Sequence, residues 1–150
     1  MNNSLQLAPW CDHLYAGDLA WWDANHSSVP EGPKLWTCTR QASAKYGLNL
    51  HTKYGGYNSG LRAIELAFDL GAERVLLLGY DCNVENGTHF HGDHVETKNP
   101  DSLRCREWMK QHARLPQSAQ VVNCSRATSL ECYALGLLEK ELQKVVDTCD

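Results

Sequence analysis

The sequence predicts an α/β fold, and three observations support this prediction. Apolar segments of strand length alternate with helical segments along the chain. Residues 74–79 are apolar at their centre without alternation, which is typical of a strand buried on both faces of a parallel sheet. No repeat, low-complexity segment or long linker divides the chain. We therefore expect a single domain, residues 1–150, with a Rossmann-like three-layer arrangement around a mostly parallel sheet of about five strands.

The first third of the chain contains three strand candidates. Residues 13–17 form a short apolar run, and the Trp-rich segment 19–25 suits a helix with Asp18 at its N-cap. Residues 34–38 and 48–53 are predicted as two further strands, joined by a small polar connection. Because an indole buries a large area, we expect the tryptophans of this part in the core or an interface and not in a base-stacking platform.

The helix that begins after residue 57 is the most clearly marked element. Asn58 and Ser59 are favourable N-cap residues, the apolar positions that follow fall on one helical face, and Gly71 occupies the position of a left-handed C-terminal residue. The strand at residues 74–79 comes next. Its continuous apolar character predicts a place in the middle of the sheet.

The second half of the chain continues the alternation after a long loop. Residues 83–101 are rich in Gly, His and Asn, and a loop of this length inside a domain is usually functional or disordered. Residues 102–113 are predicted to be helical, residues 119–123 form a further strand, and residues 136–146 form an amphipathic terminal helix.

Composition limits the classes of function. The net charge of −4 offers no broad basic face for duplex nucleic acid, and the longest apolar run is far shorter than the ~20 residues of a membrane-spanning helix. The first residues lack the basic and apolar regions of a secretory signal, so we expect a cytoplasmic protein. Seven cysteines without a Cys-x-x-Cys pair argue against a disulfide framework and a zinc ribbon, so reduced thiols are expected.

The start of the helix after residue 57 is a candidate anion site. Residues 54–60 form a glycine-rich bend that leads into the first turn, where unpaired backbone N–H groups and the positive end of the helix dipole favour a phosphate. Ser59 adds a hydroxyl donor. An ordinary helix cap is the alternative explanation, because the segment has neither a Walker nor a dinucleotide fingerprint.

Polar residues follow two of the predicted strands, at the carboxyl edge of the sheet. Asp81 comes after the apolar strand, where a carboxylate can orient a ligand hydroxyl or a catalytic histidine. Asn123 and Ser125 end the later strand and can bond a base or a sugar. Turn formation is the alternative for all three side chains. Cys82 and Cys124 lack a paired base, so we expect unreactive thiols.

The long loop holds the densest group of ionisable residues. His89, His91 and His94 lie there with Asp93. Histidine titrates near neutrality and serves as acid, base or metal ligand. Three interpretations stay open: direct acid/base or phosphate contact, a catalytic divalent metal, and a structural zinc ion. For either metal, Asp81 or Asp93 is the candidate additional ligand.

Taken together, these motifs resemble phage and prophage proteins labelled norphogenetic proteins or glycosyltransferases. That similarity spans most of the chain. A more distant similarity, at residues 58–94 and 119–126, is to the bacterial lipooligosaccharide sialyltransferases and to the domain family that includes archaeal 6-hydroxymethylpterin diphosphokinase. The motifs that carry it are Asn-Ser-Gly at 58–60, Leu-Gly-Ala-Glu-Arg-Val-Leu-Leu-Leu-Gly-Tyr-Asp at 70–81, Gly-Thr-His at 87–89 and Asn-Cys-Ser at 123–125.

The resemblance implies a nucleotide site at the carboxyl edge of the sheet. In the sialyltransferases a Ser-Gly pair at this helix start helps bind the cytidine nucleotide, which by resemblance falls on Ser59 and Gly60, next to Asn58. The Asn-Ser neighbourhood after the last strand resembles Asn123 to Ser125. Relatives usually begin with a βα unit whose glycine-rich turn binds the nucleotide, and the chain is expected to lack this unit.

The resemblance also implies a catalytic histidine in the loop after the Gly-x-Asp motif of Gly79 and Asp81. His94 is the first candidate, with His89 and His91 next. The relatives thus point to a histidine that acts on an acceptor hydroxyl and to a helix start that stabilises the departing phosphate.

Three functions are compatible with these residues. The leading hypothesis is a phage-type nucleotide or nucleotide-sugar binding protein, glycosyltransferase-like if it is an enzyme, located in the host cytoplasm. The first alternative is a non-catalytic phage protein that binds a host factor or sequesters a nucleotide against host defence. The second is a histidine-dependent metallohydrolase, which needs a divalent metal. The expected partners are a nucleotide, a host protein and a second copy in a homodimer, with no membrane and no duplex nucleic acid.

Overall fold

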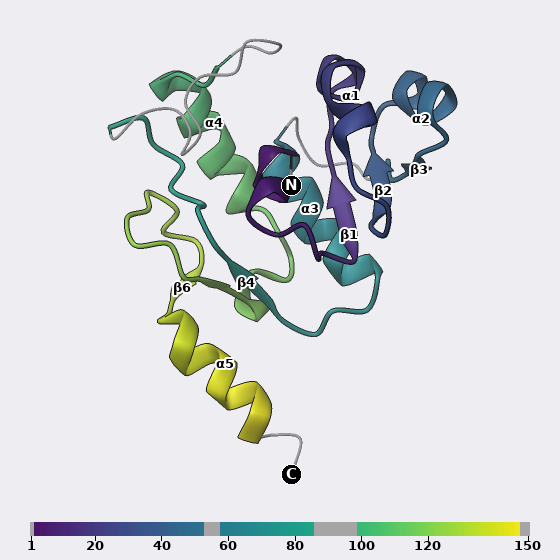
Figure 1. The fold of residues 1–150 in the computed structure, drawn as a ribbon. Coiled ribbons are helices and arrows are strands. Elements are labelled where there is room, and N and C mark those ends of the chain that lie inside the picture. The colour runs from purple at the N-terminus through teal and green to yellow at the C-terminus, as the bar shows by residue number, and fades with distance from the viewer. Residues whose placement is uncertain (1, 53–57, 86–98, 148–150) are drawn as a thin grey trace. The chain divides into compact units, whose positions relative to one another are not determined.

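The computed structural model describes residues 2–52, 58–85 and 99–147 (Figure 1). Contacts between Cα atoms divide the chain into two compact units, residues 1–66 with 87–99 and residues 67–86 with 100–150. Each unit contains helices and a three-stranded parallel sheet, which confirms the α/β class. The expected single sheet of about five strands is wrong, because the described strands form two sheets of three.

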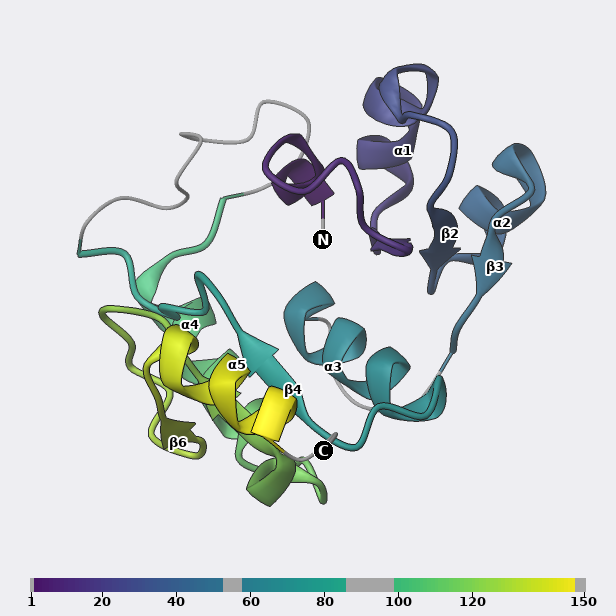
Figure 2. The ribbon, with the colours of Figure 1, turned by 60° about the horizontal axis from the view of Figure 1, so that its bottom comes forward.

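The first sheet is a βαβαβ arrangement. Strands β1 (His13–Tyr15), β2 (Lys34–Thr37) and β3 (Asn49–Leu50) are parallel neighbours in the order β1-β2-β3. Helices α1 (Leu19–Asn25) and α2 (Arg40–Tyr46) connect them and lie on the same side of the sheet (Figure 2). The second of these helices falls in the segment for which the sequence predicted only a polar connection.

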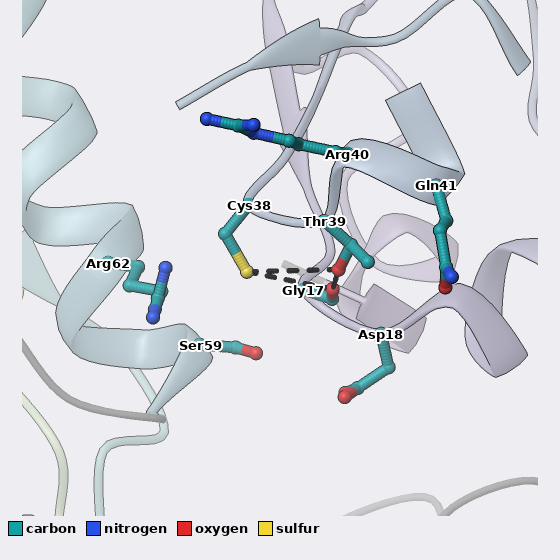
Figure 3. A pocket seen from close by; sticks show the side chains of 8 residues that line it. All are labelled: Gly17, Asp18, Cys38, Thr39, Arg40, Gln41, Ser59 and Arg62. Atoms are coloured by element: carbon teal, nitrogen blue, oxygen red, sulfur yellow. Dashed lines mark hydrogen bonds between the residues drawn. The ribbon is translucent and has the colours of Figure 1, made fainter. Parts of the chain in front are cut away.

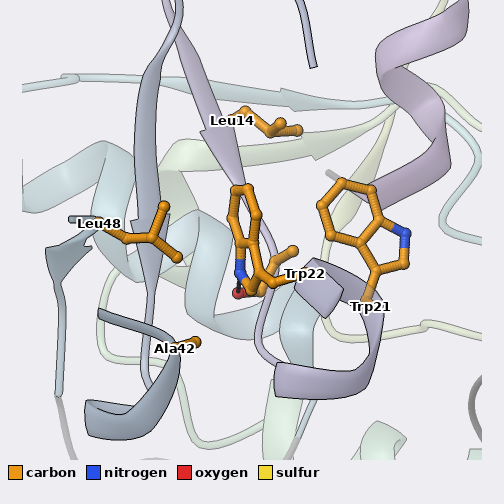
Figure 4. Packing of buried hydrophobic residues seen from close by; sticks show 6 residues of the cluster. Leu14, Trp21, Trp22, Ala42 and Leu48 are labelled. Atoms are coloured by element: carbon orange, nitrogen blue, oxygen red, sulfur yellow. Dashed lines mark hydrogen bonds between the residues drawn. The ribbon is translucent and has the colours of Figure 1, made fainter. Parts of the chain in front are cut away.

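The core of the first unit lies between β1 and these two helices. Leu14 and Ala16 are two residues apart and therefore point to the same face, where Trp21 and Trp22 of α1 pack against them (Figure 4). The indole Nε1–H of Trp22 donates a hydrogen bond to the Ala16 carbonyl oxygen at 3.0 Å, which satisfies its buried polar atom. The prediction of core tryptophans is confirmed for these two, whereas Trp10 is 82% exposed.

Helix α3 (Ser59–Asp69) begins and ends where the sequence predicted. The Asn58 side-chain Oδ1 accepts a hydrogen bond from the Leu61 N–H at 3.1 Å, which is an N-cap bond. Ile64 and Leu61 are buried on its apolar face. Gly71 has a φ of +96° just after the helix, a left-handed conformation that glycine adopts without strain.

The second sheet has the order β4-β5-β6 and all of its strands are parallel. Its strands are β4 (Val75–Leu77), β5 (Val121–Asn123) and β6 (Ala134–Leu135). The central strand of this sheet is β5, whose three residues are all buried, and β4 is at one edge. The prediction of a central β4 is wrong, because apolar character predicts a buried strand but does not identify its neighbours.

Two helices complete the second unit. Helix α4 (Ser102–His112) starts at Asp101, whose carboxylate accepts a hydrogen bond from the Arg104 N–H at 2.7 Å. Helix α5 (Leu138–Asp147) follows β6. The described helices include none that is long and apolar enough to cross a membrane. Short 3-10 helices lie at Asn2–Gln6, His26–Ser28 and Ser118–Gln120.

Candidate functional site

A pocket of about 520 Å³ opens in the first unit where β1 and β2 end (Figure 3). Ligands of parallel α/β sheets collect at this edge, and the volume falls within the range of small-molecule sites. Three segments build it: the loop after β1, the loop after β2 with the start of α2, and the first turn of α3. The lining residues are Gly17, Asp18, Cys38, Thr39, Arg40, Gln41, Ser59 and Arg62.

Ser59 reaches the pocket because Asn58 caps the helix one residue earlier. With the Asn58 side chain engaged at the cap and its carbonyl oxygen accepting from the Arg62 N–H at 3.1 Å, Ser59 becomes the first helical residue. A Cβ atom added at Gly17 would lie 2.9 Å from the Ser59 hydroxyl oxygen. The predicted anion residue Ser59 therefore lines a pocket, while Gly60 beside it is buried.

Hydrogen bonds tie the loops after β1 and β2 together. The Thr39 hydroxyl donates to the Gly17 carbonyl oxygen, and the Cys38 thiol lies 3.6 Å from the same oxygen. The Thr39 N–H donates to the hydroxyl of the fully buried Thr37 at 3.2 Å. Because two side chains of the loop after β2 converge on one carbonyl oxygen of the loop after β1, two walls of the pocket are held together without a ligand.

The pocket is locally cationic although the chain as a whole is acidic. Arg40 and Arg62 against Asp18 leave a local charge of +1, whereas the chain carries −4. A guanidinium group suits phosphate because its N–H groups can form two parallel hydrogen bonds. The first turn of the 11-residue helix α3 adds the positive end of its dipole. These groups together favour an anionic ligand.

Tyr15 lies behind the pocket. Its side chain points to the face of the sheet opposite the Trp cluster and is 3% exposed. Burial raises the pKa of the Tyr15 phenol, and the Cys38 thiol adds to this, while the Arg62 guanidinium lowers it. The phenol therefore stays neutral at physiological pH and brings no negative charge to the site.

Asn123 and Ser125 hold the segment that follows β4 in the second unit. The fully buried Asn123 side chain donates from Nδ2 to the Tyr80 carbonyl oxygen at 3.3 Å and to the Thr128 hydroxyl at 3.0 Å. Its Oδ1 accepts from the Ser125 N–H at 3.0 Å. The Ser125 hydroxyl accepts from the Tyr80 N–H at 2.7 Å. The structure brings the two predicted residues together as supports of a loop, and ligand contact by either stays a prediction.

Asp81 follows this supported segment directly. Its carbonyl oxygen accepts hydrogen bonds from the Ser129 N–H at 2.8 Å and from the Asn83 side-chain amide at 3.2 Å. Its carboxylate is exposed, and partial loss of hydration raises its pKa. Asp81 belongs to the second unit and Ser59 to the first, so a shared site for these two residues stays a prediction.

The predicted catalytic histidines, His89, His91 and His94, lie outside the described residues, as does Asp93. Within the described ranges, no group of three or more His, Cys, Asp or Glu side chains is arranged to hold a metal ion. The catalytic and metal-binding interpretations of this loop stay predictions.

The six cysteines in the described ranges are free: Cys11, Cys38, Cys82, Cys105, Cys124 and Cys132. Burial raises the pKa of the Cys82 thiol to about 12, with smaller effects from the neighbouring Cys105 and Cys132. Desolvation also raises the pKa of Cys124. Both thiols are therefore protonated at neutral pH, which makes them weak nucleophiles.

Sequence reasoning missed most of the pocket. Thr39, Arg40 and Gln41 lie in the segment predicted as a small polar connection, because α2 is only seven residues long and lacks a clear apolar period. Two signals were present. A polar run directly follows the second strand, and Arg62 is three residues after Ser59, which places both on one side of α3.

The fold and this pocket together define an α/β protein with an anion-suited site at the edge of a parallel sheet. Comparison with family models, with curated proteins and with solved structures finds no match for the chain.

Proposed function

We propose that the protein binds a nucleotide or a nucleotide sugar, with the phosphate groups in the pocket between the loops after β1 and β2 and the start of α3. One observation carries the proposal: Ser59, at the first turn of α3, shares a pocket of about 520 Å³ with Arg40 and Arg62. The resemblance of the sequence motifs to nucleotide-binding families implies a nucleotide at the same Ser59.

The charges are suited to phosphate and also set the expected strength of binding. Two unit charges 4 Å apart interact by about 1 kcal/mol in water and about 4 kcal/mol at the effective dielectric constant near a protein surface. Arg40 is exposed, so its contribution belongs near the lower value. We therefore expect losing this one charge to weaken phosphate binding by about five- to tenfold, since 1.4 kcal/mol corresponds to a factor of ten.

Isothermal titration calorimetry against nucleoside monophosphates, nucleoside diphosphates and nucleotide sugars of the common bases tests the proposal. At least one ligand should bind, with an affinity that falls as salt is added, and both Arg40→Gln and Ser59→Ala should weaken it. Arg106→Gln is the matched control, because it removes the same charge from an exposed position on α4. No binding across the whole panel, or equal losses in the control, would refute the proposal.

Transfer of the sugar is the second part of the proposal, and the resemblance to glycosyltransferases supports it. In this reaction a histidine of the long loop, with His94 as the first candidate, acts as general base on an acceptor hydroxyl. The pocket stabilises the departing nucleotide phosphate. Turnover of a labelled nucleotide sugar that is lost in His94→Ala supports transfer. Tight binding without turnover would limit the function to that of a binding protein.

A further inference from the structure

Asp18 places a carboxylate in a pocket that otherwise favours anions. It occupies the N-cap position of α1, but its side chain makes no capping hydrogen bond. Among the described residues its carboxylate also forms no ion pair, although two arginines line the same pocket. The helix cap and a local ion pair therefore do not account for its position.

The side chains of the pocket are arranged by charge. Figure 3 shows the guanidinium groups of Arg40 and Arg62 on one side of Gly17, and the side chains of Asp18 and Gln41 on the other. A carboxylate repels phosphate, so its presence lowers the affinity for a simple anion. It accepts strong hydrogen bonds from hydroxyl groups. The arrangement suits a ligand with phosphate at one end and a diol at the other.

We propose that Asp18 is a specificity residue that accepts hydrogen bonds from the 2′- and 3′-hydroxyl groups of a ribose. The pocket then selects ribonucleotides over 2′-deoxyribonucleotides. The inference rests on the proposed nucleotide binding and adds the identity of the sugar. Because Asp18 is exposed and water can replace a lost partner, we expect a preference of about tenfold, near the lower end for a charged hydrogen bond.

Removing the carboxylate should change the affinities of two ligands in opposite directions. In Asp18→Ala, ribonucleotide affinity should fall about tenfold, because the diol loses its acceptor. Affinity for inorganic pyrophosphate should rise about two- to fivefold, because a like charge leaves the pocket. A residue that only supports the fold would lower both affinities, so the opposite signs identify direct recognition.

Calorimetry with one base in its ribo and 2′-deoxy forms, and with pyrophosphate, tests this inference. Wild type and Asp12→Ala should both prefer the ribo form, since Asp12 is an exposed carboxylate at the opposite end of β1. Asp18→Ala should bind the two forms within about twofold of each other. Asp18→Asn keeps one acceptor oxygen and should retain a preference of about threefold.

The possible results separate the inference from the proposed function. Equal binding of both forms by the wild type, an undiminished preference in Asp18→Ala, or weaker pyrophosphate binding in that variant overturns the role of Asp18 and leaves nucleotide binding intact. Absence of any nucleotide binding overturns both. A melting temperature of each variant within about 2 °C of that of the wild type shows that the variants are folded when their affinities are compared.

Discussion

Replacing Asn123 with alanine should destabilise the second unit by about 2–3 kcal/mol. The change removes three hydrogen bonds, but their partners are affected unequally. The Tyr80 carbonyl oxygen keeps the bond donated by the Thr128 hydroxyl at 2.7 Å, so both of these groups remain satisfied. The Ser125 N–H loses its acceptor, and an unsatisfied buried donor costs about 1–3 kcal/mol.

The cost at Ser125 belongs near the lower end of that range, because this residue is half-buried and water can approach it. The lost amide adds a second contribution, since Asn123 is 0% exposed and its removal leaves a small cavity that costs on the order of 1 kcal/mol. The sum places the variant well outside the roughly 0.5 kcal/mol expected for an ordinary surface substitution.

Urea unfolding followed by circular dichroism measures this difference. Asn83→Ala is the matched control in the same unit, because its side chain bonds only to exposed neighbouring backbone and should cost less than about 1 kcal/mol. The reasoning is refuted if Asn123→Ala is as stable as the control.

Three further changes test other parts of the fold. Gly136→Ala should cost about 1–3 kcal/mol, because the new Cβ would lie 2.6 Å from the Val122 side chain, and an unchanged melting temperature would contradict this overpacking. Trp22→Phe should lower the free energy of unfolding in urea by about 2 kcal/mol, because the indole hydrogen bond and part of the buried volume are lost. Trp10→Phe, at an exposed position, should leave the free energy of unfolding unchanged. Burial lowers the pKa of His112 to about 4 from its ordinary 6.5. The folded state therefore holds this side chain neutral, and up to about 3 kcal/mol of the free energy of unfolding is lost as the pH falls from 6.5 to 4, because the unfolded chain takes up a proton there. Unfolding of His112→Gln across that range should show a shallower pH dependence, and an equal slope in both proteins would exclude His112 as the cause.

Local signals predicted most of the elements of this fold. Five of the six strands were found near their observed positions, and α3 was placed correctly because the Asn58 cap and the left-handed Gly71 are both encoded next to the helix. Asp18 was also predicted at the start of α1. Caps, turns and short apolar runs are local features, and local features can be recognised from sequence.

The partners of the strands could not be predicted in the same way. β4 and β5 are both short apolar segments, and nothing in either shows which of them is central. Strand β6 consists of two exposed apolar residues, which is too short a run to predict a strand, so only its pairing with β5 identifies it. Strand pairing joins distant segments, and a single sequence carries little information about it.

The pocket depends on the same kind of long-range arrangement, and Gly17 shows why. Its carbonyl oxygen accepts the Thr39 hydroxyl from the second loop, and its missing side chain leaves room for the Ser59 hydroxyl from α3. A residue without a side chain thus determines where the groups of two other segments lie. Each segment alone resembles an ordinary cap or turn, so the anion-suited site exists only once the three are assembled. The pocket is therefore a property of how the strand ends are held together, and for this reason its basic residues could not be predicted from the sequence, whereas Ser59 could.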